Sequence, residues 1–217
     1  MDLRLANDTI SPERATDLLL EYARRFAETL RYYDYAEHWP NLPEPEDGFS
    51  LADIGRLVVI NGRPSSSDVV ALLTPLASPL WADVPKTANF LDLPENPLGN
   101  SVYEAADRLY LALRSWKGLG STKVTKALHL KRPLLFPIID SVVKKQYTGI
   151  ATGLAREYGA PHPMIWCSVW ADARANSKQL EEIREDLRAH KHGELIADLP
   201  LLRLHDVLVW MRFNGGE

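Results

Sequence analysis

Apolar residues recur along this chain at intervals of three and four, which places them on one face of an α-helix. Such a stripe runs from Leu18 to Tyr33 after Ser11–Glu13, whose hydroxyl, proline and acid are typical of a helix start. We predict a helix from there to about Glu37. No segment alternates apolar and polar residues for long enough to need a sheet, so the sequence predicts an all-α fold.

The same periodicity predicts further helices, most of them behind a capping residue. They are Leu51 to about Ile60, Val69–Leu73, Asn100–Trp116, Ser121–Leu130, Ser141–Tyr158, a helix that includes Trp166, Trp170 and Ala173, then Ser177–His190 and about Leu199–Phe213. Trp39–Asp47 is rich in proline and predicts a loop. Pro75–Gly99 holds five prolines, and its aromatic Trp81 and Phe90 indicate a connection that docks on the core.

We expect one helical domain over residues 1–217, arranged in two lobes. The central lobe is a bundle from about Ser50 to Gly159 with its core at about residues 100–145, while the N-terminal helix packs on the C-terminal helices as a second lobe. Cys167 is the only cysteine, which excludes an internal disulfide and any zinc or iron–sulfur site with several cysteine ligands. We expect no cofactor.

The chain shows no membrane or export signal. No apolar run approaches the roughly 18 residues of a membrane-spanning helix, and Met1–Arg14 lacks a basic start followed by an apolar run. We therefore expect a cytoplasmic protein without a membrane partner.

Basic residues gather in the middle of an otherwise acidic chain. Eight basic residues and a single acid, Asp140, lie between Arg114 and Lys145, whereas the whole chain has a formal charge of −4. A basic run of this kind is typical either of a solvated helix face or of a surface that binds nucleic acid.

Two glycines lie inside this basic run, between two predicted helices. Gly118 and Gly120 flank Leu119, and alone they indicate a turn that needs a positive φ. A tight turn of this kind also points successive backbone N–H groups outward at a helix N-terminus, where they can hold one phosphate. The neighbouring Lys117, Lys123 and Lys126 could neutralise further phosphates and so position a duplex.

The segment Gly118–Asp140 resembles the helix-hairpin-helix and Gly/Pro-Asp segment of the DNA glycosylase superfamily. It has the Gly-hydrophobic-Gly hairpin, a short amphipathic helix, an apolar turn with a proline, and an aspartate in matching register. Phe136–Asp140, read as Phe-Pro-Ile-Ile-Asp, is especially similar to adenine-specific mismatch glycosylases. The resemblance implies a two-lobed helical glycosylase-like fold and duplex DNA as the partner.

The resemblance places Asp140 on the family's catalytic carboxylate, which stabilises the oxocarbenium character of an extruded nucleotide and orients a water. Asp140 is also a suitable N-cap for the helix that begins at Ser141. The family's Schiff-base lysine is absent, because that position is Thr122. This chain therefore resembles a divergent, monofunctional member without the iron–sulfur cluster, in which water is the nucleophile.

The predicted site combines one catalytic and several DNA-binding positions. Asp140 is the catalytic candidate, and Trp116 either lines a base pocket or packs in the core. The DNA-binding candidates are Lys117, Gly118, Leu119, Gly120, Ser121, Thr122, Lys123 and Lys126. We expect no metal site, since His190, His192, His205 and Asp206 are more typical of helix ends than of a ligand set.

Two functions fit these observations. The first is a DNA-binding helix-hairpin-helix protein, in its catalytic form a base-excision glycosylase. The second is a helix-hairpin-helix-derived module without catalysis that binds a protein or a small ligand. The local basic run favours the first, and the net acidity of the chain favours the second.

Overall fold

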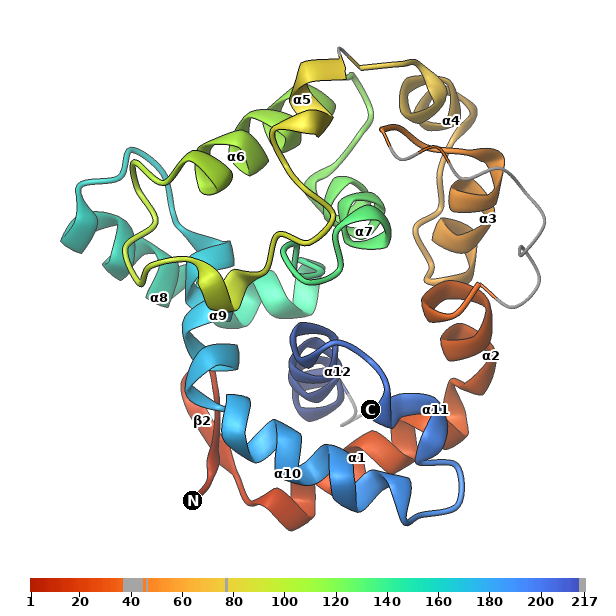
Figure 1. The fold of residues 1–217 in the computed structure, drawn as a ribbon, viewed down its shortest axis with the longest axis vertical. Coiled ribbons are helices and arrows are strands. Elements are labelled where there is room, and N and C mark those ends of the chain that lie inside the picture. The colour runs from red at the N-terminus through yellow and green to blue at the C-terminus, as the bar shows by residue number, and fades with distance from the viewer. Residues whose placement is uncertain (37–44, 46, 77, 215–217) are drawn as a thin grey trace. The chain divides into compact units, whose positions relative to one another are not determined.

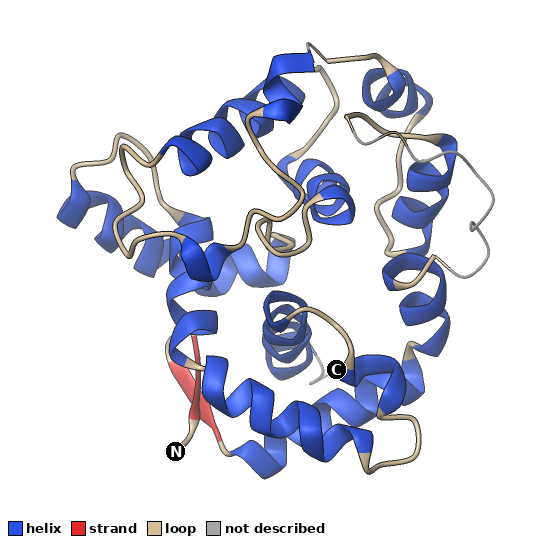
Figure 2. Cartoon of the chain, in the orientation of Figure 1, coloured by secondary structure: helices blue, strands red, loops and turns tan. Residues whose placement is uncertain are grey.

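The computed structural model describes residues 1–36, 45, 47–76 and 78–214 of the chain. These residues are mostly helical, which confirms the predicted all-α class (Figure 2). A small antiparallel sheet at the N-terminus was not predicted. Its strands β1 (Leu3–Leu5) and β2 (Asp8–Ile10) pair with Leu3 opposite Ile10 and are too short to show an alternating pattern.

The chain divides into two units, each of which has its own packed interior. Unit 1 consists of Met1–Leu30 and Ile139–Glu217, and unit 2 consists of Arg31–Ile138. Unit 1 therefore holds both ends of the described chain, and it includes the helix that follows Asp140. Unit 2 contains the glycine hairpin. We describe each unit separately.

Unit 1 is built around its last helix. Its helices are α1 (Pro12–Arg25), α2 (Ala27–Thr29), α8 (Ser141–Tyr158), α9 (Ile165–Ala175), α10 (Ser177–Arg188), α11 (Glu194–Ala197) and α12 (Leu201–Asn214). Helix α12 packs against α1, α8, α9 and α10, so it is buried on nearly all sides (Figure 1). Its residues Leu204, Val207 and Leu208 are fully buried.

Unit 2 contains four longer helices and several short turns. Its elements are α3 (Leu51–Val59), α4 (Ser66–Leu73), α5 (Ser78–Ala82), the 3₁₀ turn η2 (Phe90–Asp92), α6 (Ser101–Arg114) and α7 (Ser121–Lys131), after the π-helical turn η1 (Leu30–Asp34) at the boundary. Helix α7 packs against both α3 and α6. Trp81 and Phe90 are buried, which confirms that the proline-rich connection docks on the core.

Most predicted helix starts are confirmed, because their caps are made by local side chains. Ser50 and Ser65 cap α3 and α4, Asn100 caps α6 and Asp140 caps α8. Asn61 has a φ of 57°, so it closes the end of α3 in the left-handed conformation.

The predicted first helix is too long. Helix α1 ends at Arg25 because Phe26 leaves the helical conformation, with φ −123° and ψ 33°. The Phe26 ring lies 4.9 Å from that of Tyr22 and 5.3 Å from that of Trp210, so aromatic packing holds the chain in this bend. The predicted end of the helix at Glu37, like most of the predicted loop Trp39–Asp47, lies outside the described residues.

No helix of the described ranges is long and apolar enough to cross a membrane.

Candidate nucleic-acid interface

The hairpin before α7 has the positive φ that its glycines predict at Gly118, whereas Gly120 is extended, with φ −68° and ψ 157°. Gly118 has a φ of +100°, a conformation that residues with a side chain rarely adopt. Leu119 is 1% exposed and anchors the turn in the core of unit 2, whereas Gly118 and Gly120 are exposed. The buried Leu119 side chain therefore fixes the hairpin on unit 2, and the backbone at the two glycines faces solvent.

The N-terminus of α7 has no side-chain cap. Gly120 is the N-cap residue, and its carbonyl accepts the N–H of Val124 at 3.1 Å. The N–H groups of Ser121, Thr122 and Lys123 have no acceptor among the residues that the structure describes. The first turn of an α-helix carries partial positive charge, so these donors form a site that favours an anion.

Two residues that precede the hairpin fix its shape. Arg114, in the last turn of α6, donates from Nη1 to the Leu119 carbonyl. The Trp116 carbonyl accepts the N–H of Leu119 at 3.2 Å, and Trp116 itself is half-buried. Lys117 is exposed and forms no ion pair with any described residue. Among the predicted phosphate ligands, Lys117 is thus the lysine that solvent reaches most readily.

Lys123 is held by a buried carboxylate. Its Nζ lies 2.5 Å from Oδ2 of Asp68, which is fully buried at the start of α4. The same oxygen accepts the backbone N–H of Ser65 at 2.7 Å and the Ser65 hydroxyl at 2.8 Å. Burial alone would raise the pKa of Asp68, but the hydrogen bonds from Lys123 and Ser65 outweigh it and hold this pKa below its ordinary value.

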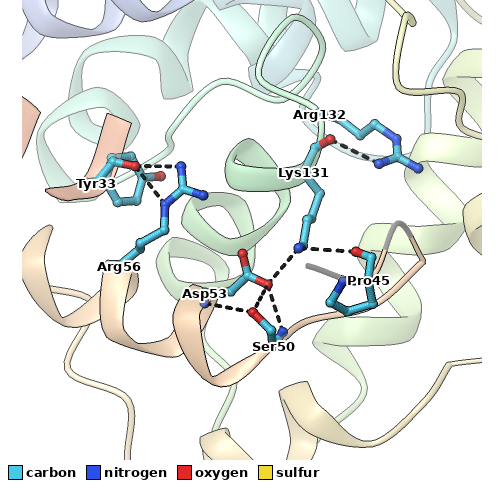
Figure 3. A network of polar contacts seen from close by, with 7 residues as sticks. All are labelled: Tyr33, Pro45, Ser50, Asp53, Arg56, Lys131 and Arg132. Atoms are coloured by element: carbon cyan, nitrogen blue, oxygen red, sulfur yellow. Dashed lines mark hydrogen bonds and ion pairs between the residues drawn. The ribbon is translucent and has the colours of Figure 1, made fainter. Parts of the chain in front are cut away.

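Lys126 and Lys131 tie α7 to the two ends of α3. Nζ of Lys126 donates to the Ile60 carbonyl at the C-terminal end of α3, at 2.7 Å. Nζ of Lys131 lies 2.7 Å from Oδ2 of Asp53, in the first turn of α3 (Figure 3). Helices α3 and α7 therefore run antiparallel to each other, and both lysines are buried between protein groups.

Two arginines of unit 2 are also used inside the unit. Arg132 is 2% exposed, donates from Nε to the Val84 carbonyl at 2.6 Å and lies over the Trp81 ring. Arg56 donates to the Tyr33 carbonyl through both Nε, at 2.8 Å, and Nη2, at 2.6 Å (Figure 3). Much of the basic run thus stabilises unit 2. Lys123 and Lys126, which were predicted to bind phosphate, are bound to protein groups instead.

Asp140 lies in unit 1 and caps α8. Its Oδ1 accepts the backbone N–H groups of Val142 and Val143, each at 2.9 Å. Its Oδ2 has no hydrogen-bond partner within the described part of the chain, and the residue is only partly buried. Capping therefore occupies one carboxylate oxygen and leaves the other available to a water.

A buried polar network in unit 1 was not found from the sequence. Asp172 on α9 accepts the N–H of Ala6 at 2.7 Å, the Tyr147 hydroxyl at 2.9 Å and Nε of Arg4. Nε2 of His205 lies 3.0 Å from the Tyr147 hydroxyl. These residues come from β1, the turn after it, α8, α9 and α12, and no local pattern links such distant positions.

The network also fixes the state of His205. The Tyr147 proton goes to Asp172, so Nε2 of His205 must donate to the Tyr147 oxygen, and Nδ1 of His205 has no partner among the described residues. Burial, followed by the positive charge of Arg4, lowers the pKa of His205 to about 3. Burial raises the pKa of Asp172 above its ordinary value.

The histidines considered for a metal do not form one site. His205 is committed to Tyr147, and Asp206 pairs with Arg203. Within the described residues, no three histidine, cysteine or acidic side chains form a group that could hold a metal ion.

The model of one protein family matches residues 9–213. The chain belongs to this family, DUF6308, a family of unknown function. The match includes the hairpin of unit 2 and Asp140 of unit 1, so both candidate positions lie inside the region that defines DUF6308. No curated protein and no solved structure matches the chain.

Proposed function

We propose that the Gly118–Gly120 hairpin binds a backbone phosphate of duplex DNA. The observation that carries this proposal is the row of uncapped N–H groups at Ser121, Thr122 and Lys123, next to an exposed glycine turn. Such donors suit a phosphate oxygen, and they are fixed in place because Leu119 and Arg114 hold the turn.

The resemblance to the helix-hairpin-helix segment of DNA glycosylases supports the choice of DNA. A hairpin of this kind contacts the sugar–phosphate backbone, which positions a duplex and reads no bases. Lys117 would add one mobile positive charge beside the hairpin. Binding through one backbone site and one exposed lysine implies a modest affinity with a shallow salt dependence.

Base excision is the catalytic form of this proposal. Oδ1 of Asp140 caps α8, so Oδ2 is the oxygen that would orient a water towards C1′ of an extruded nucleotide. Thr122 has no amine, and the amine of Lys123 is paired with Asp68. We therefore propose water as the nucleophile and a monofunctional reaction without a Schiff-base intermediate.

A module that binds a protein or a small ligand without catalysis is the second candidate. It is favoured by the internal use of Lys123, Lys126, Lys131 and Arg132, which gives four of the eight basic residues of the run protein partners inside unit 2. The formal charge of −4 favours it as well. A surface of this kind would bind its partner with little dependence on salt.

Binding of a labelled duplex that contains an abasic-site analogue distinguishes the two candidates. We expect binding by the wild type and by Asp140→Asn that weakens as salt is raised and is tighter than for an intact duplex. Release of a base from a panel of damaged duplexes should be lost in Asp140→Asn. Absence of duplex binding by the wild type and by Asp140→Asn at low salt would contradict the DNA proposal and favour a protein or small-ligand partner.

A further inference from the structure

Unit 2 contains the same polar arrangement twice. At the start of α4, Oδ2 of Asp68 accepts the N–H and hydroxyl of Ser65 and pairs with Lys123 at 2.5 Å. The other carboxylate oxygen, Oδ1, is buried and has no hydrogen-bond partner in the described part of the chain. One oxygen of this acid therefore makes every polar contact, and the other makes none.

At the start of α3, Oδ2 of Asp53 accepts the N–H of Ser50 at 2.8 Å and its hydroxyl at 3.0 Å, and pairs with Lys131 at 2.7 Å (Figure 3). Its Oδ1 is likewise buried and has no partner among the residues that the structure describes. Both acids are 0% exposed. The two clusters thus match in chemistry and in burial.

The clusters differ in where they meet α7. Lys131 is the last residue of α7, whereas Lys123 lies in its first turn, which carries the proposed phosphate donors. Oδ1 of Asp68 lies 3.2 Å from the position that a Cβ atom would take on Gly118. A buried negative charge therefore lies directly beside the hairpin.

We propose that Asp68 competes internally with phosphate and holds the affinity of the hairpin down. Its carboxylate occupies the ammonium group of Lys123, whose own backbone N–H is one of the uncapped groups. Its charge also repels an incoming phosphate, because like charges at short range in a partly dry site are screened weakly. This inference rests on the proposed binding of DNA by the hairpin.

The Lys123 side chain is 27% exposed, whereas that of Lys131 is 5% exposed. An ammonium released from Asp68 therefore has a path to solvent and to a bound duplex. The same release at Asp53 would leave Lys131 inside unit 2. Lys123 can therefore exchange the carboxylate of Asp68 for a phosphate, whereas Lys131 cannot exchange that of Asp53.

Asp68→Asn tests the inference, with Asp53→Asn as the matched control. In each variant the amide oxygen can replace Oδ2 and keep the capping contacts, and the NH₂ group takes the place of the unpartnered Oδ1. Both variants remove one negative charge from a buried cap in unit 2. They differ in the end of α7 that loses its ion pair and in the access of the released lysine to solvent.

The measurement is the affinity for a duplex as a function of salt. Thermal unfolding is recorded for each protein as well, so that the stabilities of the variants can be compared. Asp68→Asn frees one cation, so the slope of log affinity against log salt should steepen by about 0.9. A fourfold rise in salt would then cost this variant about 3.5-fold more affinity than the wild type. Asp53→Asn should keep the wild-type slope.

The double variant with Asp68→Asn and Lys123→Gln completes the test, because the gain must disappear when the released cation is removed. Equal slopes for Asp68→Asn and Asp53→Asn, with wild-type binding intact, would overturn the internal competition alone. A gain that persists without Lys123 would also overturn it. No binding by the wild type or by any variant would overturn the proposed DNA binding together with this inference.

Discussion

Nζ of Lys131 lies 2.7 Å from Oδ2 of Asp53, and both side chains are buried. The pair joins the C-terminal end of α7 to the first turn of α3, and Lys131 also reaches the Pro45 carbonyl at 3.3 Å. A buried ion pair adds little stability compared with an apolar pair, but removing one partner leaves the other charge without compensation. Through this ion pair, α7 holds the first turn of α3 in place within unit 2.

We predict that Lys131→Met lowers the free energy of unfolding of unit 2 by about 3–5 kcal/mol, because it leaves Asp53 buried and unpaired. Arg108→Ala is the matched control in the same unit, since Arg108 pairs with Asp83 at 3.3 Å and both side chains are about half exposed. That loss should stay within about 1 kcal/mol. Denaturant titration measures both changes, and similar small losses would show that α7 does not depend on the buried pair.

The buried His205 predicts a dependence of stability on pH. Its pKa is lowered to about 3 in the folded chain, against 6.5 for the free side chain, so only the unfolded chain takes up the proton between these values. Stability is therefore present above pH 6.5 and falls as the pH drops below it. From pH 7 to pH 5.5, His205 should account for a loss of about 1.3 kcal/mol.

His205→Gln removes this contribution while keeping a donor towards Tyr147. Denaturant titrations at pH 7 and pH 5.5 should show a smaller pH effect in this variant than in the wild type. Asp172 works in the opposite direction, because its raised pKa favours proton uptake by the folded state. The difference between the two proteins isolates His205, and identical pH effects would contradict its assignment as a buried neutral base.

Gly118 should tolerate a side chain poorly. Its φ of +100° is unfavourable for alanine, and a Cβ atom would approach Oδ1 of Asp68 at 3.2 Å. We predict that Gly118→Ala destabilises the protein by about 1–2 kcal/mol. Gly149→Ala, in the middle of α8 and facing open space, should instead stabilise by about 0.5–1 kcal/mol. Thermal unfolding separates the two, and equal effects would mean that the hairpin accepts another backbone conformation.

Asp140 should contribute to stability through its capping of α8. Asp140→Ala loses both hydrogen bonds to the start of α8 and should cost about 1 kcal/mol of stability. Asp140→Asn keeps an acceptor at the same place and should stay within a few tenths of a kcal/mol of the wild type. Urea titration of the three proteins checks this, and a loss in Asp140→Asn as large as in Asp140→Ala would show that its charge matters to folding.

Local sequence patterns predicted much of the fold. The starts of α3, α4, α6 and α8 depend on a capping side chain one residue before the helix, so both the signal and its consequence lie within a few residues. The bend at Phe26 was missed because it depends on Trp210, which lies far away in the sequence. Tertiary packing there overrides a helical pattern that continues through the bend.

The partners of the charged residues could not be predicted from spacing. The basic run predicts a solvated or DNA-binding face for Lys126, yet every residue from Val124 to His129 is buried, because α7 is covered on several sides. The Lys123–Asp68 and Arg4–Asp172 pairs join positions 55 and 168 residues apart. Helical periodicity indicates which face of a helix is buried, but it does not indicate which distant group lies opposite.

The most direct test of the hairpin as a phosphate site is duplex binding by Ser121→Pro. A proline is well suited to this first helical position, since Gly120 already has the extended φ of −68° and ψ of 157° that a following proline requires, and it removes one N–H donor. Leu51→Pro is the matched control, because Leu51 is the first residue of α3 and is 68% exposed.

We predict that Ser121→Pro weakens duplex binding at low salt by about tenfold, the effect of one charge-assisted hydrogen bond, while Leu51→Pro binds like the wild type. Wild-type affinity in Ser121→Pro, with duplex binding otherwise intact, would show that the start of α7 does not hold the phosphate and would contradict the central claim.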